Sequence, residues 1–335
     1  MQIGVIGAGA LGSLLAARLT RAGHEVQVVA RGQQRDTIAA HGIEVRGGFG
    51  DDRVAVRVVD HLEAVELCLV CTKAHDAAAA LESHAGELPS IPVVMMQNGI
   101  DATTIARNYL AKGQIFGGIS LIAANFTEAG VVTVTNPQPT FIGRGSGPAD
   151  QPSREIAALL NDAVPTTAID EFEGALWTKL ILNMINAIPA ITGQPVQEAV
   201  TDPFLLKVLT ASMREAARVG LAAKVSFAKL HQLDATLVTQ LAQRPLWRAK
   251  QIPLRMARGM GPVPNLASTL QSIRRGRPTE IDYLNGAIVR TAEGIGMDAP
   301  INRALTALVH EVESGGPHLS SEQLRTALAA RGVRL

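Results

Sequence analysis

The 335-residue sequence predicts an α/β domain built on a parallel sheet, followed by an all-helical domain. In the first half, short apolar runs that suit buried strands alternate with segments of helical periodicity. Strands joined by helices imply βαβ units and right-handed crossovers. After residue 170 the strand signals fade, while helical periodicity continues. We therefore expect one domain over residues 1–169 and a second over residues 170–335.

Each expected element rests on a short stretch of this pattern. The strands expected in the parallel sheet are Ile3–Ile6, Val26–Ala30, Leu67–Cys71, Val93–Gln97 and Ile115–Ile119. Helical spacing between them is clearest at Leu11–Ala22 and Asp76–Ser83. Further strands, expected to be antiparallel at the far side of the sheet, are Val54–Val58, Gly130–Thr135 and Thr140–Ile142. A helix over about residues 152–162 and a strand over 166–168 would complete the first domain. The helices expected in the second domain are Glu171–Ile188, Pro203–Gly220, Ala228–Gln243, Glu280–Gly294 and Asn302–Ser314.

The composition excludes several classes of protein. With 47% hydrophobic and 18% charged residues, the chain has the balance of an ordinary globular protein. The net charge of +1 provides no large basic field for nucleic acid or an anionic membrane. No run approaches the roughly 18 consecutive apolar residues of a membrane span, and the glycine-rich N-terminus lacks the basic flank of a secretion signal. We expect a cytoplasmic protein without a nucleic-acid or membrane partner.

Two cysteines, Cys68 and Cys71, have the spacing of redox or zinc motifs. They lie in a short apolar run that is expected to be a buried strand. A zinc site would need two further ligands, and none is close in the sequence. We interpret both as core residues and expect no metal.

A G-x-G-x-x-G motif follows the first expected strand and opens the first expected helix; its residues are Gly7, Ala8, Gly9, Ala10, Leu11 and Gly12. The pattern alone is weak, but this strand–turn–helix context is the one that dinucleotide binding requires. The glycines would permit a tight turn, close approach of a pyrophosphate, and close packing of helix on strand. The free N–H groups at the start of the helix would attract the phosphates. The alternative is a glycine-rich connection without a ligand.

The residue after the second strand indicates which dinucleotide is bound. An NAD-selective protein has Asp or Glu there to bind the ribose 2′-hydroxyl, whereas this chain has Arg31. Arginine can pair with a 2′-phosphate, and Lys73 is expected at the same sheet edge. The alternative for Arg31 is a solvated surface residue, and Asp76 near Lys73 would repel a phosphate. We predict NADP(H) as the cofactor.

Three further segments carry polar residues at positions that suit chemistry. Asn98 follows a strand, at the sheet edge where ligands bind, although an Asn-Gly turn explains it equally well. Lys179, Asn183 and Asn186 share one face of an otherwise apolar helix. Desolvation there would lower the pKa of the lysine and favour proton donation near neutral pH, while the alternative is a lysine that extends to the surface. Thr279 is expected to cap a helix, which would leave Glu280 as a partner of the helix dipole.

These segments together resemble the ketopantoate reductase (2-dehydropantoate 2-reductase) family, a relative of the 6-phosphogluconate-dehydrogenase-like enzymes. The resemblance rests on the glycine motif, Gln97-Asn98-Gly99, Leu176-Trp177-x-Lys179-Leu180 and the run Thr279 to Gly286, in this order, and it covers essentially the whole chain. It implies a Rossmann-type domain and a helical C-terminal domain like that of 6-phosphogluconate dehydrogenase.

The resemblance also implies roles for individual residues. Lys179 takes the position of the general acid, Glu280 contacts the substrate hydroxyl and the cofactor side, and Asn98 touches cofactor and substrate. Asn183 and Ser268 match substrate-binding positions, with Asn186 close to another. Arg31 and Lys73 match the 2′-phosphate contacts, and an alanine at 123 or 124, taken as Ala123, lies along the cofactor.

Two departures concern the substrate. Asn186 follows Lys179 by seven residues, whereas the best-known members have an asparagine at eight, and Val196 stands where a further asparagine is expected. We therefore expect reduction of a 2-oxo acid by NADPH, with 2-dehydropantoate to (R)-pantoate as the leading reaction in pantothenate biosynthesis. The alternatives are the same chemistry on another 2-oxo acid, or a non-catalytic NADP-sensing protein. A homodimer is also open, because the region of Trp247, Met256 and Met260 could be domain core or a subunit interface.

Overall fold

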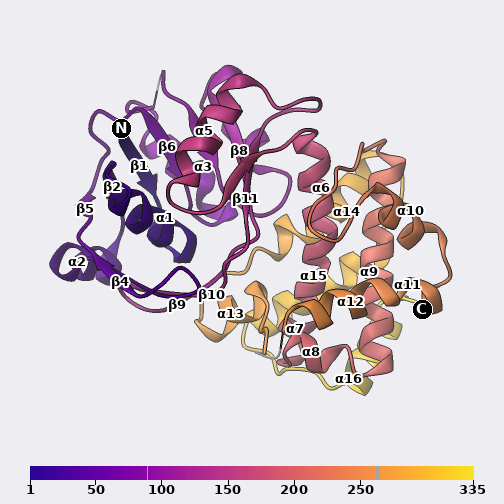
Figure 1. The fold of residues 1–335 in the computed structure, drawn as a ribbon. Coiled ribbons are helices and arrows are strands. Elements are labelled where there is room, and N and C mark those ends of the chain that lie inside the picture. Colours follow the sequence, from indigo (N-terminus) through magenta and orange to yellow (C-terminus); the bar gives the residue numbers. More distant parts are fainter. Residues whose placement is uncertain (89, 262–263) are drawn as a thin grey trace. The chain divides into compact units, whose positions relative to one another are not determined.

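The computed structural model describes residues 1–88, 90–261 and 264–335 (Figure 1). The chain forms two compact units, Met1–Phe172 and Glu173–Leu335. The first unit is α/β and the second is helical, so the predicted fold class is confirmed.

The first unit is built on an eight-stranded sheet in the order β12-β11-β8-β7-β6-β1-β2-β5. All neighbouring pairs are parallel except β11 with β8. The five predicted parallel strands are confirmed, with ends shifted by one or two residues. The bounds are β1 (Gln2–Ile6), β2 (Glu25–Val29), β5 (Arg57–Val59), β6 (Leu67–Val70), β7 (Val93–Met95), β8 (Ile115–Ser120), β11 (Thr140–Gly143) and β12 (Thr166–Ala168).

A second, four-stranded sheet corrects two predictions. Its order is β4 (Asp52–Val54), β3 (Ile43–Gly47), β10 (Val131–Asn136) and β9 (Ala123–Glu128). The predicted strand Val54–Val58 is wrong, because the chain leaves β4 there and enters β5 in the other sheet. The strand predicted at Gly130–Thr135 exists as β10, but it lies in the small sheet, antiparallel to β9 and parallel to β3. Only Thr140–Ile142 joins the main sheet antiparallel, as predicted.

Both faces of the main sheet are buried under apolar side chains. One cluster contains Leu14, Leu15 and Leu19 of α1 with Ile3 and Val28 of the sheet. The other packs residues of α3 and α4 against β6 and β7. Burial of both faces explains why these strands are continuous apolar runs rather than alternating ones. The helices of this unit are α1 (Ala10–Arg21), α2 (Gly32–His41), η1 (Ala74–Asp76), α3 (Ala77–Ser83), α4 (Ala102–Ala106), η2 (Lys112–Gln114) and α5 (Gln151–Asn161).

The two cysteines belong to this core. Cys68 is fully buried in β6, and Cys71 packs partly buried just beyond it. Burial raises the pKa of both thiols, that of Cys71 to about 12. Thiols held protonated in this way are poor nucleophiles.

The second unit consists of helices and short 3₁₀ turns. They are α6 (Phe172–Asn183), η3 (Met184–Asn186), α7 (Ala187–Thr192), α8 (Val196–Ala199), α9 (Pro203–Ala222), α10 (Ala235–Gln243), α11 (Leu246–Ala249), α12 (Gln251–Gly259), α13 (Ser268–Arg274), η4 (Ile281–Tyr283), α14 (Asn285–Gly294), α15 (Pro300–Glu313) and α16 (Ser321–Ala330).

Two of the predicted helices begin too early. The helix expected from Ala228 starts at Ala235, because Leu230 and Leu233 form a small bridge and Asp234 then caps α10. The helix expected from Glu280 starts at Asn285, after the separate turn η4. Thr279 is therefore not its N-cap, and Glu280 is buried rather than exposed in a first helical turn.

A buried polar network fixes the middle of the helical unit. Asn302 of α15 donates to the Glu215 carboxylate of α9 at 2.7 Å and accepts from Asn285 of α14 at 2.8 Å. The Ser212 hydroxyl also donates to Asn302, at 2.8 Å. Buried polar groups of this kind are costly unless paired, so the network specifies how three helices meet.

Among the described residues, one helical stretch has the length of a membrane span. Phe172–Thr192 has a mean hydropathy of 1.2 in its most apolar window, and 72% of that window is buried inside the protein. Core burial explains such a sequence, and length and composition alone do not make it a membrane helix.

Candidate active site

The glycine-rich turn lies at the carboxyl end of β1. Each of its three positions requires or permits glycine for a different physical reason. Gly7 has φ +102°, and a Cβ there would lie 2.8 Å from the Thr72 nitrogen. A Cβ on Gly12 would lie 2.0 Å from the Gly7 carbonyl oxygen. Gly9, by contrast, is exposed, and a Cβ there would meet nothing within 4 Å. Gly7 and Gly12 therefore shape the turn, while Gly9 leaves open space beside it.

That open space faces the start of α1. Gly9 is the N-cap of α1 and provides no side-chain cap, and the first turn contains no acidic residue. The remaining residues of the motif, Ala8, Ala10 and Leu11, have small or apolar side chains. Uncapped N–H groups with the positive end of a helix dipole attract a phosphate. The turn thus fits the pyrophosphate of a dinucleotide.

Gln34 holds this turn from α2. Its side-chain nitrogen donates to the Ala8 carbonyl at 2.9 Å and to the Ser13 hydroxyl at 3.3 Å. Its side-chain oxygen accepts from the Gly130 N–H, between β9 and β10, at 2.8 Å. The sequence analysis missed Gln34, since a glutamine on a polar helix carries no distinctive signal.

Arg31 follows β2 and forms the N-cap of α2. Its side chain is exposed, and it makes no ion pair with any residue in the described part of the chain. Arg35, one helical turn on, is instead paired with Asp60 at 3.0 Å. Arg31 is therefore the arginine at this strand end that can accept an anionic ligand.

Lys73 follows β6, on the other side of β1, as the exposed N-cap of η1. Because β2, β1 and β6 are adjacent and parallel, Arg31, the glycine turn and Lys73 occupy one edge of the sheet. Asp76, the discordant neighbour, has its carboxylate 3.4 Å from the His75 ring. That contact gives Asp76 a partner of its own.

Asn98 lies at the same edge, beyond β7. Gln97 just before it donates to the carbonyls of Val70 and Thr72, at 2.9 and 3.2 Å, which ties the ends of β6 and β7 together. Asn98 itself is half-buried, and Gly99 after it has φ +93°. The chain therefore bends at Asn98 and Gly99, just beyond β7, at the position where a ligand contact is expected.

Two polar atoms beside this edge are buried without a hydrogen-bond partner in the described structure, the Gln97 side-chain oxygen and the Thr72 hydroxyl. Buried polar atoms are normally paired, so unpaired ones at a binding edge suit a ligand that would complete them. Together with Gly9 and Arg31 they fit a nicotinamide dinucleotide. Ala123 begins β9, where its carbonyl accepts from the Thr135 hydroxyl at 3.2 Å, and its place along the cofactor stays a prediction.

In the helical unit, Lys179 lies in the middle of the apolar helix α6. It is partly buried, and burial lowers its pKa to about 8, while the nearby carboxylate of Glu280 raises it. Glu280 is only 5% exposed. The structure thus brings together two predicted site residues that are far apart in the sequence.

The asparagines that follow Lys179 lie where α6 tightens into η3. The side-chain nitrogen of Asn183 is buried and lacks a hydrogen-bond partner among the described residues. Asn186 lies in η3 and is 6% exposed. An unpaired amide four residues from the lysine is suited to hold a polar group of a ligand.

Ser268 is the first residue of α13, which packs against η3 and α7. The residue before it, Ala267, has φ +57°, a conformation that costs a non-glycine residue energy. The Asn265 side chain holds it by accepting from the Ala267 N–H at 2.8 Å. The sequence analysis missed this strained residue, which sets the direction of Ser268.

Val196, which replaces a polar residue expected from the resemblance, begins α8 and is 1% exposed. Its N–H donates to the Asn265 carbonyl at 2.8 Å. Val196 is therefore a core residue that supports the loop before Ser268.

Elsewhere, a group of potential metal ligands lies in the first unit. The His61 and His84 rings each bond one oxygen of the Glu87 carboxylate. Each of the three side chains thus has a hydrogen-bond partner within the group.

Comparison with known proteins supports the assignment of the whole chain. Residues 3–147 match the family described as ketopantoate reductase PanE/ApbA, and residues 171–313 match its C-terminal domain. A 2-dehydropantoate 2-reductase of Archaeoglobus fulgidus is 30% identical over 317 residues, covering 94% of this chain and 98% of its own.

Solved structures agree with this family. The PanE/ApbA family ketopantoate reductase from Ralstonia eutropha JMP134 has a TM-score of 0.80 at 30% identity, over 94% of this chain and 99% of its own. A D-mandelate dehydrogenase with NADH and anilino(oxo)acetate has the same fold, with a TM-score of 0.79 at 21% identity over 94% of this chain and 99% of its own. The chain therefore belongs to the ketopantoate reductase family and is an oxidoreductase that depends on a nicotinamide dinucleotide.

Proposed function

We propose that the protein reduces a 2-oxo acid with NADPH and that Lys179 is the general acid. The observation that carries the proposal is the lysine itself, partly buried in an apolar helix with a pKa of about 8 and a buried glutamate beside it. A group with this pKa is still mostly protonated at neutral pH, yet donates a proton more readily than an ordinary lysine.

The chemistry needs a hydride and a proton, and the bound nicotinamide would supply the hydride. The Lys179 ammonium would stabilise the negative charge that develops on the ketone oxygen and then protonate it. Glu280 would keep the lysine charged and hold a substrate hydroxyl. General acids of this type typically contribute about 10²–10⁴-fold to the rate.

For the cofactor, the proposal is NADP rather than NAD. Arg31, without an ion pair in the described chain, would hold the 2′-phosphate together with Lys73. Ala8, Ala10 and Leu11 with the three glycines would hold the pyrophosphate at the start of α1, and Asn98 and Ala123 would line the nicotinamide side.

For the substrate, the leading proposal is 2-dehydropantoate, reduced to (R)-pantoate on the way to pantothenate. Relatives of that name match over nearly the whole chain. The unpaired Asn183 amide, Asn186 and Ser268 would orient the acid, with Ser268 near its carboxylate and Asn98 and Lys179 at its ketone.

Two observations favour another 2-oxo acid as the alternative. At the position where the resemblance implies an asparagine, Val196 has an apolar side chain that is 1% exposed, so it offers the substrate no polar group. The fold is also shared by a D-mandelate dehydrogenase whose structure contains an oxo acid with an aromatic substituent. Measuring turnover with a panel of 2-oxo acids distinguishes the two substrate proposals. No turnover of 2-dehydropantoate, together with good turnover of another acid, would exclude 2-dehydropantoate as the substrate.

Replacement of Lys179 by alanine tests the mechanism. We expect NADPH oxidation with the preferred acid to fall by about 10²–10⁴-fold while NADPH still binds. Unchanged turnover would refute the general acid, and a wild-type protein that binds NADPH but turns over no acid would favour a non-catalytic sensor.

The proposal includes a cytoplasmic location, and a homodimer is the alternative to a monomer. The sequence allowed Trp247 to lie either in the domain core or at a subunit interface. Its side chain is 62% exposed, so it is not a core residue. Light scattering of the purified protein measures its mass in solution, and a monomer at micromolar concentration contradicts the dimer.

A further inference from the structure

The segment that carries Glu280 has little structure of its own. Thr279 and Glu280 are 7% and 5% exposed, and they lead into the three-residue turn η4. At Leu284 the backbone leaves helical geometry, with φ −107° and ψ −93°, before α14 begins. A 3₁₀ turn of this length is weak by itself, so neighbouring contacts must hold the Glu280 backbone.

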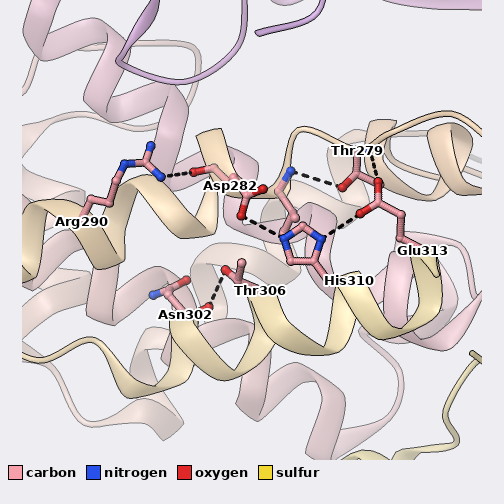
Figure 2. A network of polar contacts seen from close by, with 8 residues as sticks. Thr279, Asp282, Arg290, Asn302, Thr306, His310 and Glu313 are labelled. Carbon is pink, nitrogen blue, oxygen red and sulfur yellow. Dashed lines mark hydrogen bonds and ion pairs between the residues drawn. The ribbon is translucent and has the colours of Figure 1, made fainter. Parts of the chain in front are cut away.

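Two such contacts, one on each side of Glu280, come from the end of α15 (Figure 2). On one side of Glu280, the Thr279 N–H donates to the Glu313 carboxylate. On the other, the Asp282 carboxylate lies 2.9 Å from the His310 ring. His310 and Glu313 are themselves joined at 2.9 Å. The four residues form a continuous chain of polar contacts that brackets Glu280.

Charge strengthens this chain. A neutral imidazole has one N–H and can donate to only one of the two carboxylates, whereas an imidazolium donates to both. Partial burial lowers the pKa of His310, but its hydrogen bonds and charge interactions with Asp282 and Glu313 outweigh that effect, and the pKa is raised. The Arg290 guanidinium of α14 also contacts this turn, because it donates a hydrogen bond to the Asp282 carbonyl at 2.8 Å.

We propose that His310 and Glu313 are positioning residues that clamp the backbone on both sides of Glu280 and so hold its carboxylate beside Lys179. This inference rests on the proposed roles of Lys179 and Glu280. Neither His310 nor Glu313 touches the reacting atoms in this scheme. They act through Glu280 alone.

The clamp has a readout that a purely structural role lacks. The Glu280 carboxylate raises the pKa of Lys179. If the clamp is cut, Glu280 moves and this opposing effect weakens, so the pKa of the lysine falls. The alkaline limb of the rate profile, where the lysine loses its proton, then shifts to lower pH.

The experiment compares His310→Ala and Glu313→Ala with the wild type and with Glu311→Gln. Glu311 lies on the same helix but pairs with Arg331, away from the clamp, which makes it a matched control. We expect both clamp variants to lower kcat on the order of tenfold, since small displacements in a catalytic group are costly, with NADPH affinity unchanged. Their alkaline limbs should move to lower pH, and Glu311→Gln should match the wild type.

Glu313→Gln refines the test, because its amide oxygen can still accept from the Thr279 N–H. Glu313→Gln should recover part of the activity lost in Glu313→Ala. If the alanine variants do not fold, Glu313→Gln and His310→Gln replace them as the milder pair of substitutions. Folded variants with a wild-type alkaline limb and kcat would overturn the clamp. If Lys179→Ala remains active, the proposed function fails instead, so the two failures are distinguishable.

Discussion

The Glu280 carboxylate acts on Lys179 against the larger effect of burial, and the balance leaves the lysine with a pKa of about 8. The two residues lie on separate elements, α6 and the loop before η4, within one helical unit. Their electrostatic coupling gives a direct way to test which group supplies the proton.

Replacement of Glu280 by glutamine should lower the pKa of Lys179 below about 8, because it removes the charge that opposes desolvation. The protonated lysine is the active form in a reduction. As the pH rises, the variant should therefore lose its activity at a lower pH than the wild type does, while activity at acidic pH is retained. The pH profile of kcat/KM measures this directly. An alkaline limb at or above that of the wild type contradicts the coupling.

Replacement of Arg31 by alanine should weaken NADPH binding on the order of tenfold or more, because charge-assisted bonds to a phosphate are lost. NADH, which lacks the 2′-phosphate, should be nearly unaffected. Fluorescence titrations with both cofactors measure the ratio, and Arg35→Ala is the matched control, since Arg35 is already paired with Asp60. Equal weakening of both cofactors would falsify the 2′-phosphate role.

The glycines of the turn should respond in opposite ways to a methyl group. Gly9→Ala has open space for its Cβ and φ −75°, so the melting temperature should change little while NADPH binding is strongly reduced. Gly12→Ala would place a Cβ 2.0 Å from the Gly7 carbonyl oxygen, so it should destabilise the fold by several kcal/mol, on the order of 2–4. Calorimetry and cofactor titration on both variants separate the effects. Equal losses of stability would show that Gly9 is also structural.

Replacement of Asn302 by alanine should destabilise the protein by about 2–4 kcal/mol, because buried groups of Glu215, Ser212 and Asn285 lose their partner. Arg303→Ala, next in the same helix, removes only exposed ion pairs and should cost below about 1 kcal/mol. Urea denaturation of both compares them. Similar midpoints would mean that solvent replaces the network.

The strand–turn–helix–strand unit at the N-terminus could be predicted to within one or two residues, because its apolar runs and glycines are local signals. The small sheet was predicted only in part: β10 was expected as a strand but in the main sheet, and β3 and β9 were not expected. β3 is a run of only five residues, although Ile43 and Val45 alternate with polar neighbours, and the alanines and Asn125 give β9 little strand preference. Likewise, nothing local reveals that the chain changes sheets between Val54 and Arg57.

For the candidate site, the sequence and the family resemblance together pointed to Lys179, Asn98 and Glu280, while the environment of these residues required coordinates. Burial of Glu280 was not predictable, since the helix expected at Thr279 begins only at Asn285. Gln34 and Ala267 were missed for the same reason: their importance lies in contacts and backbone geometry rather than in residue type.

The Gln34 side chain links the glycine turn to the small sheet through hydrogen bonds, so cofactor binding at the turn should be detectable in the small sheet. One amide group joins the Ala8 carbonyl to the Gly130 N–H, so we expect these two segments, far apart in the sequence, to become ordered together. A cofactor that steadies the turn steadies this amide as well. The Gly130 proton should then exchange with deuterium more slowly in the saturated protein, which would allow occupancy to be followed by mass spectrometry from a hairpin outside the turn.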